Sequence, residues 1–288
     1  MRPSMVSIRI AALVVAALLL GTTCADVQAW GAKGHRMIGH MARDLLSPQT
    51  RAAIQQLMGS DDLATFSLYL DKRKDQLEQE FPGSRQWHDD DEPICTTKPY
   101  PEYCPNGTCA STQLPRYYQV LVDADASTSK KPFAVFVLTH LVGDMHQPLH
   151  AADHEDRGGN EIKVLLPDGR KTNLHAAWDT SLVEHLYGGQ NDMTVATRLM
   201  QQYASHATAW QAGNVDLATM QAWIDDANHL AKEVAYGKLP GFACQADMEQ
   251  TRIILSDDYL HRAEPVVEEQ LAKAGYRLAS ILNRALGD

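Results

Sequence analysis

Apolar residues recur at every third or fourth position through most of this chain, and this spacing strongly limits the folds it can adopt. The period places apolar side chains on one face of an α-helix. Pro48, Pro115 and Pro132 stand near the starts of predicted helices, where a missing N–H costs little. We therefore predict a mainly α-helical fold. The expected helices cover residues 37–46, 51–58, 63–77, 114–122, 133–145, 180–186, 217–236 and 259–286.

Two stretches break the helical pattern. Residues 89–110 are rich in Asp, Pro, Gly and Cys, which is typical of a long loop. Residues 160–174 alternate around the turn Pro167-Asp168-Gly169, which predicts one short β-hairpin. Because no repeat or linker divides residues 30–288, we expect them to form a single domain.

The first 29 residues have the pattern of a secretory signal peptide. Arg2 and Arg9 flank the start of the segment, residues 10–20 are uninterruptedly apolar, and the segment ends in Val-Gln-Ala29 with small side chains. The apolar run is shorter than the roughly 20 residues of a transmembrane helix. We predict cleavage between Ala29 and Trp30, a secreted or periplasmic protein, and no membrane span.

Export favours disulfide bonds between the cysteines. Four of the five remain after the predicted cleavage, and an even number in an oxidising compartment indicates two bonds. A zinc ribbon would need two closely spaced pairs, and only Cys104 and Cys109 are close in sequence. We predict the bonds Cys104–Cys109, which closes a tight loop, and Cys95–Cys244, which ties the irregular loop to a distant turn.

The charge balance limits how the chain could bind nucleic acid. It has 26 basic and 36 acidic residues, a formal net charge of −10, within an ordinary globular composition of 44% hydrophobic residues. This argues against a protein that binds nucleic acid by neutralising phosphates with Lys and Arg. Bound metal could supply positive charge instead, and the chain has 12 histidines.

The densest group of metal-ligating residue types runs from position 140 to 150. His140 and Asp144 are four residues apart on a predicted helix, so both can project from one face toward one metal ion. His146 faces away from that stripe, which indicates a bystander. Pro148 should end the helix, so His150 lies beyond it and points elsewhere.

The same spacing recurs in His175 and Asp179. One such pair alone is more often a solvated or capping pair, but two in an exported chain indicate metal binding. At the predicted mature terminus, the α-amine and carbonyl of Trp30 could chelate a metal ion as a five-membered ring, with His35 five residues away. A frayed terminus with a helix-borne histidine is the alternative.

Taken in order, these residues resemble the S1/P1 family of zinc-dependent nucleases, which share a helical fold with zinc phospholipases C. Two positions depart from that pattern: Leu68-Tyr69-Leu70 stands in place of Ser-Trp-Ala, and Asp89 in place of an apolar residue. The resemblance rests on Trp30-Gly-Ala-Lys-Gly-His35, Asp71, His88, the block from Thr139 to His150, Gly158-Gly159-Asn160, and Asn173 to Thr180.

The resemblance implies a single-domain helical fold, similar to phospholipase C and P1 nuclease, that holds three zinc ions. Asp144 would bridge the first ion and the third. The other ligands would be Asp71, His88 and His140 for the first ion, His150, His175 and Asp179 for the second, and Trp30 with His35 for the third.

The resemblance also implies roles for residues that do not bind metal. Asp91 would orient the attacking water, and Lys74 would stabilise the charged transition state. Asn160, with Gly159 in the same turn, would contact the substrate. Zinc lowers the pKa of bound water to about 7, which makes hydroxide available at neutral pH.

These observations predict a secreted zinc endonuclease that cleaves single-stranded DNA and RNA to 5′-phosphate products, and that also acts on 3′-nucleotides. We expect a monomer. A zinc phospholipase C is the alternative, although that family typically has Glu at the position of Asp179 and lacks the insertion between His150 and His175. A non-catalytic zinc-binding protein would explain the histidines but not the open coordination positions of the second ion.

Overall fold

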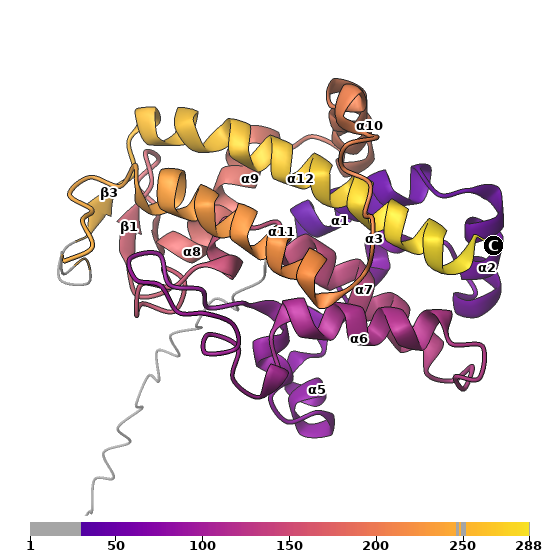
Figure 1. The fold of residues 1–288 in the computed structure, drawn as a ribbon. Helices are drawn as coiled ribbons and strands as arrows, with labels where there is room; N and C mark the ends of the chain where they lie inside the picture. Colours follow the sequence, from indigo (N-terminus) through magenta and orange to yellow (C-terminus); the bar gives the residue numbers. More distant parts are fainter. Residues whose placement is uncertain (1–29, 246–247, 249–251, 288) are drawn as a thin grey trace, which may run out of the picture.

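The protein is described here by a computed structural model covering residues 30–245, 248 and 252–287, so the predicted signal peptide lies outside the described residues. The fold is mainly helical, as predicted (Figure 1). The first half of the chain forms helices α1 (Gly31–Asp44), α2 (Pro48–Met58), α3 (Leu63–Phe66), α4 (Tyr69–Lys72), α5 (Lys74–Glu80), α6 (Ala110–Val122) and α7 (Lys131–Asp144), with short 3₁₀ turns η1 (Ser84–His88), η2 (Pro105–Gly107) and η3 (Pro148–Ala151).

The second half adds a small sheet and the longest helix. It contains strands β1 (Lys163–Leu165), β2 (Lys171–Asn173) and β3 (Ile253–Ile254), helices α8 (Leu174–Ala176), α9 (Leu182–Tyr187), α10 (Asp192–Gln202), α11 (Leu217–Leu230) and α12 (Asp257–Leu286), the π-helical segments η4 (Ala177–Ser181) and η6 (Ala231–Tyr236), and the 3₁₀ turn η5 (Ala204–His206).

Helix α7 lies at the centre of the molecule. All of its residues from Thr139 to Asp144 are buried, and it packs against α1, α3, α4, α6 and α12. A helix that is apolar on all sides has no face suited to solvent. Any polar side chain on this helix, including His140 and Asp144, must therefore find its partners inside the protein.

Helix α12 supports this core from the other side. Its 30 residues begin at the N-cap Ser256, whose hydroxyl accepts the N–H of Tyr259 at 3.2 Å. It crosses most of the molecule in Figure 1 and packs along α1, α2, α6, α7 and α9. Because α1 touches both α12 and α7, the N-terminal residues of the described chain are held next to the central helix.

The predicted β-hairpin is present. Strands β1 and β2 pair antiparallel, with Val164 opposite Thr172. The sheet also has a third strand that the sequence did not predict, because β3 contains only two residues, and it pairs parallel with β1. In the sequence, the hairpin lies between His150 and His175.

Three helical features differ from the prediction. The single helix expected at residues 63–77 is three short helices, since the chain leaves helical geometry at Leu68, with φ −94° and ψ 1°, and again at Arg73, with φ −121° and ψ 13°. Pro115 lies inside α6 rather than near its start. Helix α10 was not predicted, because its buried residues Val195, Ala196 and Leu199 give too short an apolar pattern.

Both predicted disulfides are present. Cys104 and Cys109 join at a Cα–Cα distance of 5.6 Å, and Cys95 and Cys244 join at 5.5 Å across 149 residues. The longer link ties the irregular loop after His88 to the segment following η6. Closing so long a loop is worth up to about 5 kcal/mol in the chain-entropy model.

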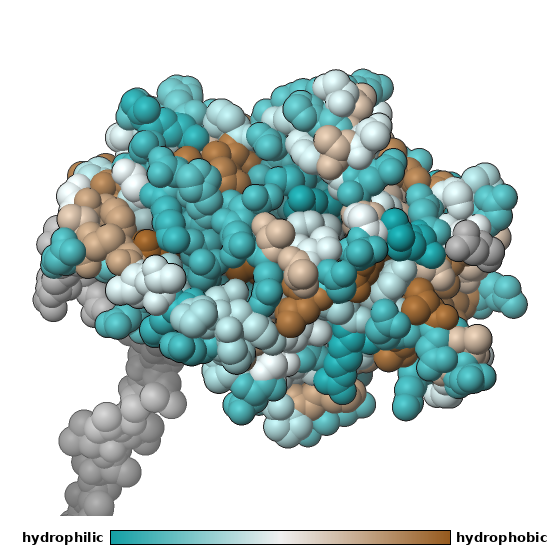
Figure 2. Space-filling view, in the orientation of Figure 1, coloured by the Kyte–Doolittle hydropathy of each residue, from teal (hydrophilic) through white to brown (hydrophobic). Residues whose placement is uncertain are grey.

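Among the described residues, the exposed large hydrophobic side chains are Val122, Met193 and Ile254. The face in Figure 2 is mainly hydrophilic, with hydrophobic residues in separate small patches. In the part of the chain that the structure describes, no helix has both the length and the apolar character needed to cross a bilayer.

Candidate metal centre

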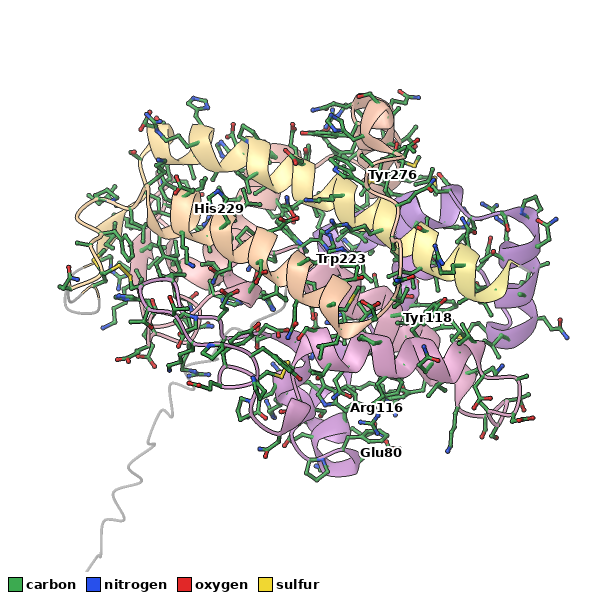
Figure 3. All side chains as sticks on the ribbon, viewed as in Figure 1. Glu80, Arg116, Tyr118, Trp223, His229 and Tyr276 are labelled. Atoms are coloured by element: carbon green, nitrogen blue, oxygen red, sulfur yellow. A yellow bond between two sulfur atoms is a disulfide. The ribbon has the colours of Figure 1, made fainter. Side chains whose placement is uncertain are left out.

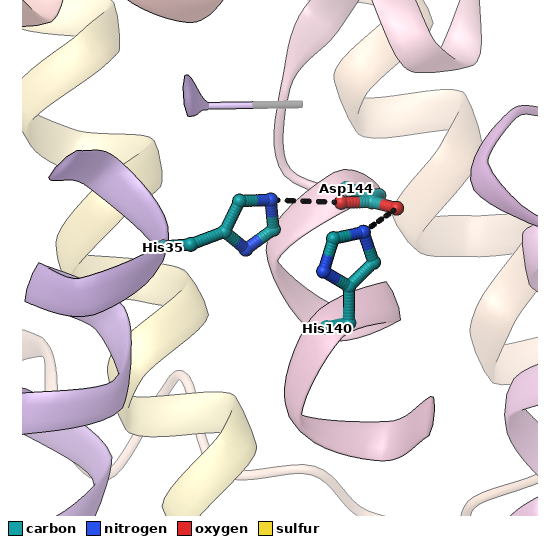
Figure 4. Close-up of side chains that lie close together, drawn as sticks. All are labelled: His35, His140 and Asp144. Atoms are coloured by element: carbon teal, nitrogen blue, oxygen red, sulfur yellow. Dashed lines mark ion pairs between the residues drawn. The ribbon is translucent and has the colours of Figure 1, made fainter. Parts of the chain in front are cut away.

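Asp144, at the end of α7, lies between His35 and His88 and forms one group of possible ligands with His35 and His140. His35 projects from α1, and its Nε2 lies 3.3 Å from Asp144 Oδ1 (Figure 4). On the other side, Asp144 Oδ2 lies 3.2 Å from His140 Nε2 and 2.8 Å from His88 Nδ1. The two carboxylate oxygens therefore point to different groups of nitrogen atoms, as a bridging ligand requires.

A group formed by Asp71, His88 and His140 lies on the Oδ2 side of Asp144. His140 Nε2 is 3.0 Å from His88 Nδ1 and 3.6 Å from Asp71 Oδ1. Asp71 lies in α4, a helix of four residues that packs against α7. Its side chain is buried.

His150, His175 and Asp179 form a separate group. His150 lies in η3, beyond the end of α7, and its Nε2 is 3.0 Å from His175 Nε2. Asp179 lies in the π-helical segment after α8, with Oδ2 3.4 Å from His175 Nε2. His150 thus points away from the His140 stripe and toward this second group.

The donor atoms of these groups suit metal ions. Two ligand atoms of one tetrahedral zinc, each about 2.0–2.2 Å from the ion, lie roughly 3.3–3.6 Å apart, close to the separations above. Buried polar atoms without a partner are costly and rare in native proteins. Here the unpartnered buried atoms include both ring nitrogens of His35, Asp71 Oδ2, Asp144 Oδ1 and Asp179 Oδ2. Divalent ions would satisfy the carboxylate oxygens and one of the two His35 nitrogens.

Backbone carbonyls hold three of the histidine rings with Nε2 facing inward. The Nδ1–H of His140 donates to Ser67 O at 2.6 Å, and that of His175 to Gly158 O at 2.8 Å. His150 Nδ1 lies 3.0 Å from His88 O. Such contacts fix the tautomer and leave Nε2 as the metal ligand.

The sequence did not identify two residues that support the second group. Asp89 Oδ1 lies 2.8 Å from His150 Nδ1, and Gln147 Nε2 donates to Asp179 Oδ1 at 2.6 Å. Gln147 Oε1 accepts the N–H of Leu149 at 2.7 Å, which fixes the orientation of the amide. In the sequence, Asp89 stands out only as a departure from the family pattern. No spacing in the sequence predicts the contact between Gln147 and Asp179.

Trp30 lies directly before α1, next to the Asp144 cluster. Its side chain is fully buried, and its indole N–H donates to Gly143 O at 3.0 Å. A Cβ at Gly143 would lie 3.0 Å from the His35 ring, so the small residue lets α1 approach α7 closely. Trp30 and His35 are therefore neighbours of Asp144 in space as well as in the predicted ligand set.

Electrostatics keep Asp144 ionised. Burial alone would raise its pKa, but the facing His140, with His35 and His88, holds the pKa of this carboxyl well below its ordinary value. For Asp91, burial and the neighbouring carboxylates Asp89 and Asp153 raise the pKa to about 7.

The candidate catalytic side chains face one pocket of about 520 Å³. Lys74, Asp91 and Asn160 line it together with Asp71, His88, His150 and His175. Gly159 does not line this pocket, although its neighbour Gly158 does, because Gly159 packs against the Leu174 side chain.

His146 lies outside all three groups. It is buried, its Nδ1–H donates to Val142 O at 2.7 Å, and Arg277 donates to its Nε2 at 2.8 Å. The Arg277 guanidinium in turn covers Trp223, which projects from α11 (Figure 3), at 4.2 Å. His146 therefore links the end of α7 to α12 and α11.

We expect His146→Ala to leave the zinc content unchanged and to lower the free energy of unfolding by about 1–3 kcal/mol, because Arg277 would lose its buried acceptor. Denaturant unfolding and metal analysis check this. His150→Ala is the matched comparison and should lose zinc. Zinc loss in His146→Ala, with none in His150→Ala, would contradict the assignment of the two histidines.

The fold and the clusters define a helical protein with a candidate multinuclear metal centre, and comparison with known proteins specifies its class. The family model described as S1/P1 Nuclease matches residues 30–287. The chain belongs to the S1/P1 nuclease family.

Its relatives include fungal and plant enzymes. It is 30% identical to Nuclease S1 of Aspergillus oryzae, over 98% of this chain and 97% of the relative. It is 29% identical to Nuclease P1 of Penicillium citrinum, over 90% and 98%, and 26% identical to Endonuclease 2 of Arabidopsis thaliana, over 91% and 92%. This membership supports a hydrolase that acts on nucleic acids, and favours a nuclease over the alternative of a phospholipase C.

Proposed function

We propose that this protein is a zinc-dependent endonuclease that cleaves single-stranded DNA and RNA to 5′-phosphate products, and that also dephosphorylates 3′-nucleotides. One observation supports this most strongly. In a member of the S1/P1 nuclease family, buried and unpartnered ligand atoms gather in groups, two of which contribute residues to the wall of one open pocket.

Three zinc ions account for the donor set. Asp144 would be shared between two of them, because its oxygens face different clusters. The ligands would be Asp71, His88 and His140 for the first ion, His150, His175 and Asp179 for the second, and His35 with the Trp30 amine and carbonyl for the third.

When bound, zinc supplies activated water at neutral pH and positive charge for phosphate. Asp91 lines the pocket, so its carboxylate can orient the attacking water. Lys74, also on the pocket wall, stabilises negative charge on the phosphoryl oxygens. Asn160 binds the substrate from the turn that precedes β1.

The burial of the ligands favours an unpaired strand. His150, His175 and Asp179 are each at most 3% exposed, so a phosphodiester must enter the pocket to reach them. A single strand can bend its backbone inward, whereas a duplex is stiff and its base pairing resists such local bending. The pocket therefore selects against paired substrate.

Processing and export complete the proposal. Residues 1–29 act as a signal peptide, cleaved between Ala29 and Trp30, and the mature monomer is secreted or periplasmic. The two disulfides suit that oxidising compartment.

We expect prolonged chelation to abolish cleavage of single-stranded DNA and RNA, and added zinc to restore it, because every ligand group loses its ion. Metal analysis beside a cleavage assay checks this, with phosphatidylcholine as the comparison substrate. Full activity after exhaustive dialysis against EDTA would contradict zinc dependence. Zinc binding without hydrolysis of any phosphodiester would indicate a non-catalytic protein.

A further inference from the structure

A strained turn borders the pocket between η3 and β1. Glu155 and Arg157 have φ of 60° and 58°, in the left-handed region that non-glycine residues rarely adopt. Gly158 follows with φ 62°, and a Cβ there would lie 2.6 Å from Leu149 O. Such strain persists only where the surroundings hold it, and it clusters at functional sites.

Two aspartates hold this turn in place. Asp153 Oδ1 accepts the N–H groups of Asp156 and Gly158, each at 3.2 Å. Asp156 is buried, and its Oδ1 accepts the Gly159 N–H and the Tyr236 hydroxyl, each at 2.8 Å. These hydrogen bonds fix the turn without using the Arg157 side chain.

The turn places the Arg157 side chain on the pocket wall. Arg157 is exposed and lines the pocket beside Asn160 and His175. Within the described ranges it makes no hydrogen bond or ion pair through its side chain, whereas Arg85, the other arginine on the pocket wall, pairs with Asp75. The guanidinium acts electrostatically on the Asp91 carboxylate, whose pKa it lowers, but no direct pair forms between the two. A strained residue with such a cation in the pocket wall is suited to a ligand that supplies negative charge.

We propose that Arg157 binds a phosphate of the nucleic-acid strand that neighbours the scissile one. The inference rests on the proposed function. The second ligand group lies behind Gly158, whose carbonyl holds His175, and its side chains are buried. The scissile phosphate must reach that depth, so an exposed guanidinium at the rim meets the next phosphate along the strand. A guanidinium fork matches phosphate oxygens in bidentate geometry.

The test compares Arg157→Gly with Arg157→Lys. Glycine removes the cation and adopts positive φ freely, so the variant should fold at least as well as the natural protein. We expect its Kd for a labelled phosphorothioate oligonucleotide to rise about tenfold, and the slope of log Kd against log salt to fall by about one. Arg157→Lys should keep most of that slope.

The control is Arg262→Ala, which removes the same charge from an exposed site on α12 where Arg262 pairs with Asp258. The specificity ratio between an oligonucleotide and a substrate with one phosphodiester should fall in Arg157→Gly only. If Arg157→Gly and Arg262→Ala give the same Kd and salt slope, the inference is wrong, even where cleavage confirms the nuclease. If Arg157→Gly weakens strand binding in a protein that cleaves nothing, Arg157 is a phosphate contact in a binding protein and the proposed function fails.

Discussion

Asp144→Asn is expected to remove zinc from the centre and to abolish nuclease activity. The carboxylate offers an oxygen to each side, with Oδ1 3.3 Å from His35 and Oδ2 2.8 Å from His88. An asparagine has one oxygen, so its amide nitrogen must face one of the two clusters and repel the ion there. The substitution also removes a fully buried negative charge that would balance the charge of the metal ions.

The loss should exceed the roughly 10–100-fold that removing an outer partner of a metal ligand costs. Zinc per chain, measured by mass spectrometry, should fall from three to two or fewer, together with the rate of hydrolysis. Asp216→Asn is the matched control, because it makes the same chemical change at the N-cap of α11, where asparagine caps equally well. Full zinc content and rate in Asp144→Asn would exclude the shared ligand.

The sequence predicted those parts of the centre that depend on local geometry. The spacing of His140 and Asp144 on one helix face requires only a helix, and the apolar period over residues 133–145 predicted that helix. The stop at Pro148 likewise separated His150 from the first group. Both inferences hold because helical geometry does not depend on the rest of the fold.

Contacts that depend on tertiary packing were beyond the sequence. Gln147 meets Asp179 across 32 residues, and nothing in either local pattern predicts that contact. In the sequence, Asp89 is only a departure from the family pattern, whereas in the fold its carboxylate lies against His150. The breaks in the helix expected at residues 63–77 were not predicted either. The short helices α3 and α4 each pack against α7, and these tertiary contacts leave no pattern in the local sequence.

The N-terminus gives the second large expected effect. One extra residue before Trp30 should lower the zinc content from three toward two per chain and reduce hydrolysis severely. In the uncleaved chain the Trp30 nitrogen is an amide without an available lone pair, and the third ion would keep only His35 and Asp144 as strong ligands, too few for a stable site. The cytoplasmic precursor would then be comparatively harmless to the nucleic acids of its own cell.

The backbone conformation of Trp30 also favours a chain that begins at this residue. With a preceding residue, this bulky aromatic must hold φ at 39°, in the left-handed region, while its indole stays fixed to Gly143. Cleavage removes that constraint, because a terminal residue has no preceding carbonyl to clash with. Removal of the signal peptide would thus release strain and create the ligand in one step.

The comparison uses chains that begin with Gly or Met ahead of Trp30, checked by intact mass, beside the chain that begins at Trp30. A glycine added after Asp288 controls for an extension as such, because it lengthens the chain next to Gly287, which lies beside Thr50 of α2. The extended N-terminus should show the lower zinc content and rate, and the extended C-terminus neither. Three zinc ions and an unchanged rate in the N-terminally extended chains would exclude the terminus as a ligand, and the third ion would then need a ligand other than the Trp30 amine.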